Sequence, residues 1–179
     1  MKPVLDATAG NRHIWGKNKY PDGVIFLDKE ENLRIPADVI ATWDNIPFED
    51  DYFHCIIFDP PHVFSLSSMY NQDPQARPNG SKKIPGWYGA FASKRQAVLE
   101  IHGAQKEFAR LASRMCFKWN EASLSIDRIL SVFTEWDINF IVPSRSRGKK
   151  PSSYWVKLSR KKQSLGTSID TKQLRTVGR

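Results

Sequence analysis

The sequence predicts one α/β domain, built on a seven-stranded, mostly parallel sheet with an antiparallel hairpin at one edge and helices on both faces. Three observations favour this architecture. Continuously apolar segments are bounded by polar turns, as in strands covered on both faces. Strand-like and helical segments alternate along most of the chain. The 179 residues, of which 40% are hydrophobic, suffice for one domain with a sizeable core.

Four short apolar segments in the first half of the chain are the expected parallel strands, at residues 4–5, 24–27, 37–41 and 55–58. Between the first two, Ile14 and Trp15 lie in a segment that can form one or two helical turns. An acidic residue stands at or beyond the end of each strand, and these four are Asp6, Asp28, Asp44 and Asp59.

The second half continues with a long helix over residues 90–113, since apolar residues recur there at helical spacing: Val98, Ile101, Phe108 and Leu111. A fifth strand is expected at 115–117. Ser123 or Ser125 can cap a helix that runs to about Trp136, with Ile129, Leu130 and Phe133 facing inward. Residues 138–142 and 153–158 are expected to form the antiparallel edge hairpin.

Residues 65–89 interrupt the alternation with a long segment rich in proline, glycine and asparagine. Tyr70, Trp87 and Tyr88 lie there among basic residues, which favours a substrate lid over plain disorder. We therefore expect a domain over residues 1–162 with an insertion at 65–89, followed by a basic tail at 163–179.

The positive charge is concentrated at the end of the chain. Residues 1–143 carry a net charge of −2, residues 144–179 carry +10, and the whole chain carries +8. This distribution indicates a polyanionic partner, nucleic acid above all. A solvated tail that makes no specific contact is the alternative for residues 163–179.

Several other classes of protein are disfavoured by composition. No apolar run approaches the roughly 18 residues that span a membrane, and the chain becomes polar too soon after Met1 for a signal peptide. Cys55 and Cys116 lie in strand-like segments, which suits core residues and a reducing compartment, the cytoplasm. Two cysteines and four scattered histidines make no zinc pattern, and we expect no metal.

The tetrapeptide Asp59-Pro60-Pro61-His62 follows the fourth strand directly. Two prolines continue neither a strand nor a helix, so a stiff extended turn is expected. Such a turn leaves its carbonyls free and holds one acidic and one aromatic side chain. It can bind a planar amine, with the carboxylate and a proline carbonyl accepting N–H bonds and the ring stacking on a base. An incidental strand-terminating turn is the alternative.

The strand-end acids indicate a ligand site, because open parallel sheets bind ligands outside the carboxyl ends of their strands. Asp28 lies 22 residues after Asp6, the spacing at which an acidic residue reaches ribose hydroxyls in dinucleotide-binding folds. Gly10 lets the first loop pass close to a ligand. Any one of these acids alone is better explained as a helix cap or a solvated loop residue.

Taken together, these segments resemble class I S-adenosylmethionine-dependent methyltransferases, which have a Rossmann-like fold. The matching segments are residues 6–10, Asp28, residues 44–48 and the DPPH turn. The turn fits the [DNS]PP[YFWH] signature of the amino-directed, N6-adenine type. The chain as a whole resembles small phage- and prophage-encoded members, in which the later Lys-Trp-Asn-Glu of residues 118–121 also recurs.

The resemblance implies a role for each matching residue. Asp6, Ala7, Thr8, Ala9 and Gly10 would surround the methionine part of the cofactor, S-adenosylmethionine. Asp28 would bind the ribose hydroxyls, and Asp44, Asn45 and Ile46 the adenine. Asp59 and Pro60 would hold the target amine, with Pro61 stiffening the turn and His62 stacking on the target base. Arg12 stands where many relatives have a second glycine, and it could place a cation near the cofactor carboxylate.

The expected reaction is direct methyl transfer to adenine N6 in DNA or RNA, with a base taken out of any duplex. Six basic residues are candidates for phosphate contacts: Lys82, Lys83, Arg145, Arg147, Lys149 and Lys150. One alternative keeps the reaction and changes the acceptor to cytosine N4, a protein amide or a small molecule. Another is a nucleic-acid-binding module whose cofactor site is inactive. The sequence leaves the oligomeric state open.

Overall fold

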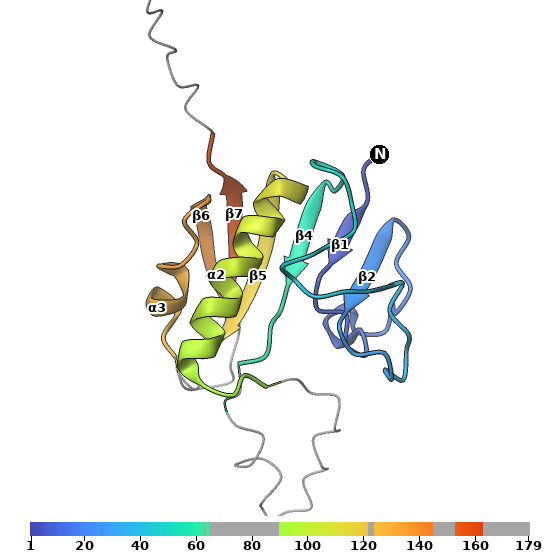
Figure 1. Ribbon diagram of the computed structural model, residues 1–179, viewed down its shortest axis with the longest axis horizontal. Helices are drawn as coiled ribbons and strands as arrows, with labels where there is room; N and C mark the ends of the chain where they lie inside the picture. The colour runs from blue at the N-terminus through green and yellow to red at the C-terminus, as the bar shows by residue number, and fades with distance from the viewer. Residues whose placement is uncertain (63, 65–89, 122–123, 145–152, 163–179) are drawn as a thin grey trace, which may run out of the picture.

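The computed structural model describes residues 1–62, 64, 90–121, 124–144 and 153–162. Its strands are β1 (Val4–Asp6), β2 (Val24–Asp28), β3 (Val39–Ile40), β4 (Cys55–Phe58), β5 (Arg114–Asn120), β6 (Trp136–Pro143) and β7 (Ser153–Arg160). They form one sheet in the order β3-β2-β1-β4-β5-β7-β6 (Figure 1). Strands β1 to β5 are parallel, and β7 is antiparallel to both β5 and β6. The predicted fold class, a mostly parallel sheet with an antiparallel edge pair, is confirmed.

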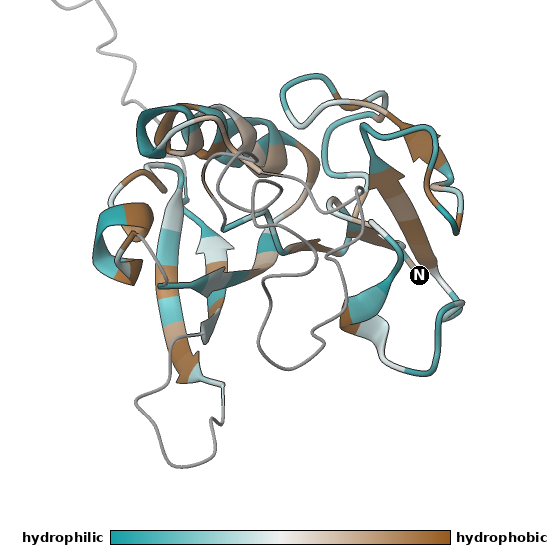
Figure 2. Ribbon diagram, turned by 90° about the horizontal axis from the view of Figure 1, so that it is seen from below, coloured by the Kyte–Doolittle hydropathy of each residue, from teal (hydrophilic) through white to brown (hydrophobic). Residues whose placement is uncertain are grey.

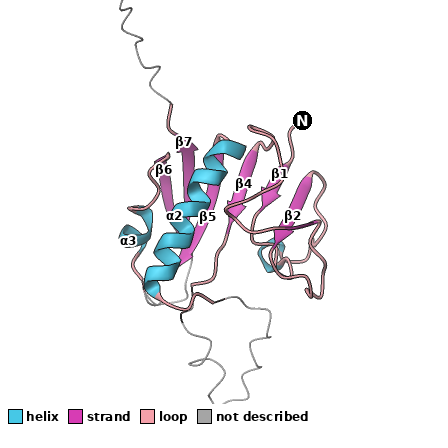
Figure 3. Cartoon of the chain, in the orientation of Figure 1, coloured by secondary structure: helices cyan, strands magenta, loops and turns pink. Residues whose placement is uncertain are grey.

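The helices α2 (Lys94–Leu111) and α3 (Ile126–Leu130) pack on one face of the sheet (Figures 2 and 3). Phe108 of α2 lies with its ring centroid 4.9 Å from that of Phe58, and Phe133 lies 4.9 Å from Phe117. On the opposite face, the 3-10 helix η1 (His13–Trp15) covers β2, where Trp15 meets Phe26 edge-on at 6.0 Å. Within the described residues, the second face thus receives only this short helix.

The long helix expected over residues 90–113 is present but shorter, spanning Lys94–Leu111. The hydroxyl of Ser93 accepts a hydrogen bond from the backbone N–H of Gln96, which satisfies one of the free donors of the first turn. Ile101, Phe108 and Leu111 are fully buried, as their spacing predicts. None of the helices in the described part of the chain is long and apolar enough to cross a membrane.

The expectation of a helix from Ser123 or Ser125 to Trp136 is wrong in its length. Ser125 is the cap, but α3 ends at Leu130 and Trp136 already belongs to β6. The indole N–H of Trp136 donates to the carbonyl of Gln105, 2.9 Å away, and thereby pins the start of the strand to α2. Tertiary contacts therefore override helical spacing over residues 131–135.

The edge hairpin is present, with β7 inserted between β5 and β6. Edge strand β6 is exposed after Trp136, and its irregular register lies between Ile138 and Phe140. Phe140 is 64% exposed and Val142 51%, and apolar colour marks the end of this strand in Figure 2. The basic turn that was expected between the two strands lies outside the described residues.

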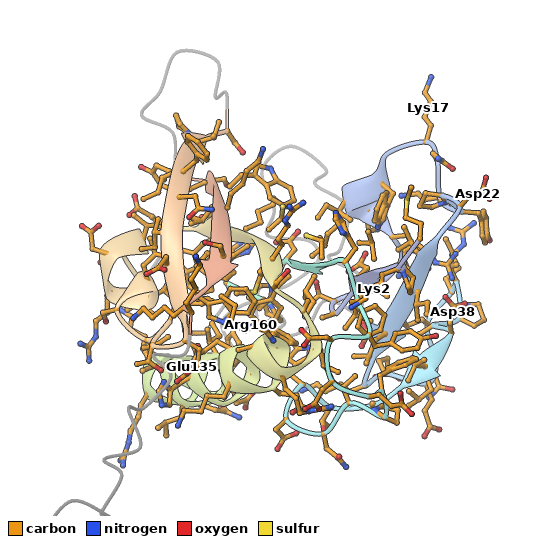
Figure 4. All side chains as sticks on the ribbon, turned by 90° about the horizontal axis from the view of Figure 1, so that it is seen from above. Lys2, Lys17, Asp22, Asp38, Glu135 and Arg160 are labelled. Atoms are coloured by element: carbon orange, nitrogen blue, oxygen red, sulfur yellow. The ribbon has the colours of Figure 1, made fainter. Side chains whose placement is uncertain are left out.

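At the amino end of the parallel strands, Arg160 of β7, which is labelled in Figure 4, connects the sheet to α2 and to the loop before β4. Arg160 bonds to Asp51 at 2.9 Å and donates to the carbonyl of Ala109 at 2.7 Å. These contacts lie at the end of the parallel strands opposite the strand-end acids. They therefore leave the carboxyl ends of the strands available for a ligand site.

Candidate active site at the carboxyl ends of β1 and β4

The strand order reverses between β1 and β4. From β1 the chain proceeds to β2 and β3 on one side, whereas β4 leads to β5 on the other. Asp6 is the register partner of Ile57, so the first loop and the DPPH turn leave neighbouring strands at the same edge. Such a reversal is the position at which open α/β sheets bind ligands.

The carboxylate of Asp6 organises the first loop from within. It has no exposed surface, and it accepts hydrogen bonds from the backbone N–H of Thr8 at 3.1 Å and the indole N–H of Trp15 at 2.7 Å. Burial raises the pKa of Asp6, although both hydrogen bonds oppose the shift. The negative charges of Asp59 and Asp28 also raise it, which shows that the three acids lie near one another.

Thr8 joins the first loop to the DPPH turn. Its hydroxyl accepts a hydrogen bond from the backbone N–H of Asp59 at 2.9 Å, and the N–H of Ala7 donates to the carbonyl of Ile57 at 2.9 Å. Since neither Pro60 nor Pro61 has an N–H, the Thr8 contact fixes the one donor at the start of the turn. The turn is therefore held against the loop that begins at Asp6.

The Asp59 carboxylate forms an ion pair with Lys118 near the end of β5. The distance from Nζ to Oδ2 is 2.7 Å, and the two side chains are 32% and 24% exposed respectively. The Lys118 ammonium also lies 5.9 Å from the ring centroid of Trp155. The sequence located Lys118 at a strand end without assigning it a role. In the structure, it forms an ion pair with Asp59, the candidate catalytic acid.

His62 is half-buried next to this pair. Burial lowers its pKa below the ordinary 6.5; the Asp59 charge opposes this shift and the Lys118 charge reinforces it. The imidazole is accordingly held toward its neutral form, which suits stacking on a base better than a cation would.

Gly10 and Asp28 close the opposite side of the first loop. Gly10 has a positive φ of 46°, and its N–H donates to Oδ2 of Asp28 at 2.8 Å. The other oxygen, Oδ1, accepts from the N–H of Glu30 at 3.0 Å. Ala9 is buried and its N–H donates to the carbonyl of Leu27, so the loop is held to β2 at two points.

Asn11 is a residue that sequence reasoning missed. The residue is 7% exposed, and its Oδ1 accepts from the N–H of Ile35 at 3.2 Å. The amide nitrogen, Nδ2, has no hydrogen-bond partner in the part of the chain that the structure describes. A buried donor directly after Gly10 is suited to a ligand oxygen, because leaving it unpaired is costly.

Arg12 is packed within the loop between β1 and β2. Its φ is 56°, a left-handed backbone conformation that glycine adopts more readily than arginine. The guanidinium lies 3.7 Å from the ring centroid of Phe26 and donates to the carbonyls of Lys19 and Pro36. The charge faces Asp38 at 3.8 Å, so Arg12 holds the β1–β2 loop together.

Asp44 lines a cavity of about 430 Å³ between the ends of β2 and β3 and helix α2. Its other lining residues are Lys29, Thr42, Trp43, Leu99, Glu100 and Gly103. The volume is in the usual range for small-molecule sites. Trp43 connects the cavity to the first loop, since its indole N–H donates to the carbonyl of Ala7 at 2.8 Å. The neighbouring Asn45 is exposed, whereas Ile46 is buried in the core.

The structure thus brings Asp6, Asp28 and Asp59 together and puts Asp44 on an adjoining cavity. The six candidate phosphate contacts, the aromatic residues of 65–89 and the basic tail lie outside the described residues. Among the residues that are described, no group of three or more acidic, histidine or cysteine side chains is arranged to hold a metal ion.

Comparisons with known proteins concern the fold. No family model matches the sequence, and no curated protein matches it. The PH0226 protein from Pyrococcus horikoshii OT3 aligns with a TM-score of 0.54 at 12% identity, over 89% of this chain and 82% of that one. A SAM-dependent methyltransferase from Methanosarcina mazei aligns with a TM-score of 0.45 at 10% identity, over 90% of this chain and 93% of that one. The Rossmann-like architecture is thereby shared with PH0226.

Proposed function

We propose that this protein is an S-adenosylmethionine-dependent methyltransferase that methylates an exocyclic amine, adenine N6 in DNA or RNA. One observation carries the proposal. The Asp59-Pro60-Pro61-His62 turn is fixed by Thr8 to the first loop, at the point where the strand order of the sheet reverses. A carboxylate, a proline carbonyl and a neutral ring would thus stand beside the proposed cofactor site.

The residues at this edge fit the cofactor. The buried, unpaired Nδ2 of Asn11 is a donor for an oxygen of the ligand, and Asp28 carries acceptors for ribose hydroxyls. Asp44 supplies an acceptor in a cavity whose walls include Trp43 and Leu99, as an adenine ring requires. When bound, S-adenosylmethionine supplies an electrophilic methyl group. Asp6 is fully buried and has both oxygens engaged inside the loop, so its proposed role is to shape the binding loop; Asp28 also accepts two backbone hydrogen bonds, but it is partly exposed and its carboxylate keeps lone pairs for the ribose.

The target amine is a poor nucleophile, because its lone pair is delocalised into the ring. Asp59 Oδ1 and the carbonyl of Pro60 would each accept one N–H bond, which favours a tetrahedral nitrogen with its lone pair directed at the methyl donor. Alignment of this kind lowers a barrier by several kcal/mol. Lys118 holds Oδ2 and so orients the carboxylate, while the neutral imidazole of His62 would stack on the base. The proton released from the nitrogen has Asp59 as its nearest acceptor.

A nucleic acid is the acceptor that the charge distribution favours. Residues 144–179 carry a net charge of +10, and each phosphate contact from Lys or Arg adds salt-dependent affinity. Lys82, Lys83, Arg145, Arg147, Lys149 and Lys150 are proposed to contribute such contacts, and the insertion at 65–89 to select the base.

The test uses methyl-labelled S-adenosylmethionine with the full chain and single-stranded or duplex oligonucleotides of DNA and RNA. Label should enter adenine-containing polymers and disappear when every adenine is replaced by hypoxanthine, which lacks the amine. Label that enters cytosine, a protein amide or a small molecule would move the activity to that acceptor. Absence of any transfer, together with absence of saturable S-adenosylmethionine binding in calorimetry, would support a binding module without catalytic activity.

A further inference from the structure

The sheet face opposite α2 carries exposed side chains along β5, β7 and β6. On the α2 side, Phe117 and Val156 are register partners, and both are fully buried. The residues next to them point the other way, because successive side chains of a strand alternate between faces. Cys116 pairs with Ile57, two residues after Cys55, so both cysteines lie on this second face. They are half-buried rather than core residues, which corrects the expectation from the sequence.

Basic, aromatic and apolar side chains make up this surface. We name it the open face, and it is formed by Arg114, Cys116, Lys118, Phe140, Val142, Trp155 and Lys157. The strand register orders these side chains in rows. Lys118 is the partner of Trp155, and Trp155 is the partner of Val142. In the next row, Lys157 is the partner of Phe140.

The open face is continuous with the candidate active site. Lys118 forms the ion pair with Asp59 at 2.7 Å, and its ammonium lies 5.9 Å from the ring centroid of Trp155. The row that contains Trp155 therefore leads from the DPPH turn to the edge strand. From β4 to β6 there are three strand spacings, or roughly 14 Å. A polymer that places one base at Asp59 can follow this row across the sheet.

The chemistry of the open face suits the bases and phosphates of a single strand. Phe140 is exposed and Trp155 half-buried, while Arg114 and Lys157 are exposed cations. Flat aromatic side chains stack on unpaired bases, and neighbouring cations bind the backbone. The acidic Asp137 lies one row beyond Phe140, on the side away from the active site. The end that is nearer to Asp59 is thus the basic and aromatic one.

We propose that the open face binds the single-stranded part of a nucleic acid substrate. Phe140 and Trp155 stack on bases, and Arg114 and Lys157 contact phosphates. The choice of polymer rests on the proposed function. The area is sufficient, because four-stranded RNA-binding sheets stack two or three bases on one face, and β4, β5, β7 and β6 are four neighbouring strands.

Two other occupants fit less well. A duplex offers no free base to Phe140, because its bases are already paired and stacked on one another. A second copy of the chain would meet this face by a two-fold contact, in which both copies contribute the same patch. Each copy would then bring Arg114 and Lys157 to the interface, and like charges brought together across an interface are unfavourable.

The experiment measures binding of a fluorescein-labelled oligothymidine of about twelve nucleotides to the full chain by fluorescence anisotropy. Thymine has no exocyclic amine, so binding is measured separately from methyl transfer. Phe140→Ala should weaken binding at least about fivefold, as expected for the loss of one stacked base. Ile141→Ala is the matched control, because it changes the next, oppositely facing and also exposed residue of β6, and it should alter the affinity less than about twofold. A duplex of the same length should bind the wild type and Phe140→Ala equally.

Lys157→Met tests the phosphate contact through the salt dependence of binding. The slope of log affinity against log salt should fall in magnitude by about 0.7, the value for one phosphate of a single strand. Phe140→Ala should leave this slope unchanged, because stacking releases no counterion. Lys106→Met, at an exposed position of α2, is the control and should also leave it unchanged.

Methyl transfer to an adenine-containing strand separates this proposal from the proposed function. Phe140→Ala should raise KM at least about fivefold and change kcat less than about twofold, because it lies away from the reacting atoms. Weakened oligothymidine binding in Phe140→Ala and Lys157→Met without methyl transfer by any variant would support the open face and overturn the proposed function. Methyl transfer with unchanged binding in both variants would do the reverse. A wild type that does not bind the oligothymidine, or a wild-type dimer that Phe140→Ala dissociates in sedimentation, would overturn the open face.

Discussion

Replacing Lys118 with Met removes the ammonium that holds the candidate catalytic carboxylate while keeping an unbranched apolar side chain near Trp155. The Nζ to Oδ2 distance of 2.7 Å is that of a strong charge-assisted hydrogen bond. Bonds to charged groups contribute about 1.5–3 kcal/mol, and exposed ion pairs at most about 1 kcal/mol. With the two side chains 32% and 24% exposed, this pair falls between these limits, at about 1–2 kcal/mol.

The assay is a double-mutant cycle of Lys118→Met and Asp59→Asn on the free energy of unfolding, measured in urea. The coupling energy should be about 1–2 kcal/mol. Lys106→Met, at an exposed position of α2, is the matched control and should show no coupling with Asp59→Asn. If Lys118 positions Asp59 as we infer, Lys118→Met should also lower kcat about 5–30-fold, and Lys118→Arg should restore part of it. A coupling energy below about 0.3 kcal/mol would refute the inferred contact.

Three further predictions concern the residues around the turn and the first loop. Burial holds the pKa of His62 below 6.5 in the folded protein, so the unfolded state binds more protons as the pH falls through 6.5. The free energy of unfolding of the wild type should therefore fall as the pH drops through 6.5. His62→Phe should lose that part of the pH dependence in urea titrations. Asp6→Asn leaves the backbone N–H of Thr8 or the indole N–H of Trp15 facing an NH2 group, and it should lower the free energy of unfolding by about 1–3 kcal/mol. An unchanged urea midpoint would contradict the hydrogen bonds of the Asp6 carboxylate. Asn11→Ala should weaken S-adenosylmethionine binding about 5–30-fold in calorimetry, whereas Asn18→Ala, at an exposed position of the same loop, should not.

The sequence predicts the parallel strands well, because each is a short apolar segment whose end is marked by an acid or a proline. Asp6, Asp28 and Asp59 come together as expected, since the carboxyl ends of parallel strands share one edge. The DPPH turn is equally local, because two successive prolines determine its conformation almost regardless of their surroundings.

The features that the sequence could not predict depend on contacts between distant segments. Lys118 meets Asp59 only because β4 and β5 are adjacent, and 59 residues separate the two. The helix expected up to Trp136 stops at Leu130 because a bond to Gln105 draws the following residues into β6. Arg12 is positioned by Phe26 and Asp38, which no local pattern indicates.

The cysteines illustrate the same limit. Cys55 and Cys116 lie in apolar segments, and from periodicity alone each resembles a core residue. Their half-exposed state follows from the absence of a long helix over this face within the described residues, which is a property of the whole fold. Their position on the same face of adjacent strands follows from a register that only the sheet specifies.

The most direct test of the central claim compares the wild type with Asp59→Ala in single-turnover methyl transfer, alongside S-adenosylmethionine affinity by calorimetry. We expect at least a roughly 100-fold loss of transfer with cofactor affinity changed less than about threefold, because Asp59 acts on the amine. Transfer at the wild-type rate by the alanine variant would contradict the account.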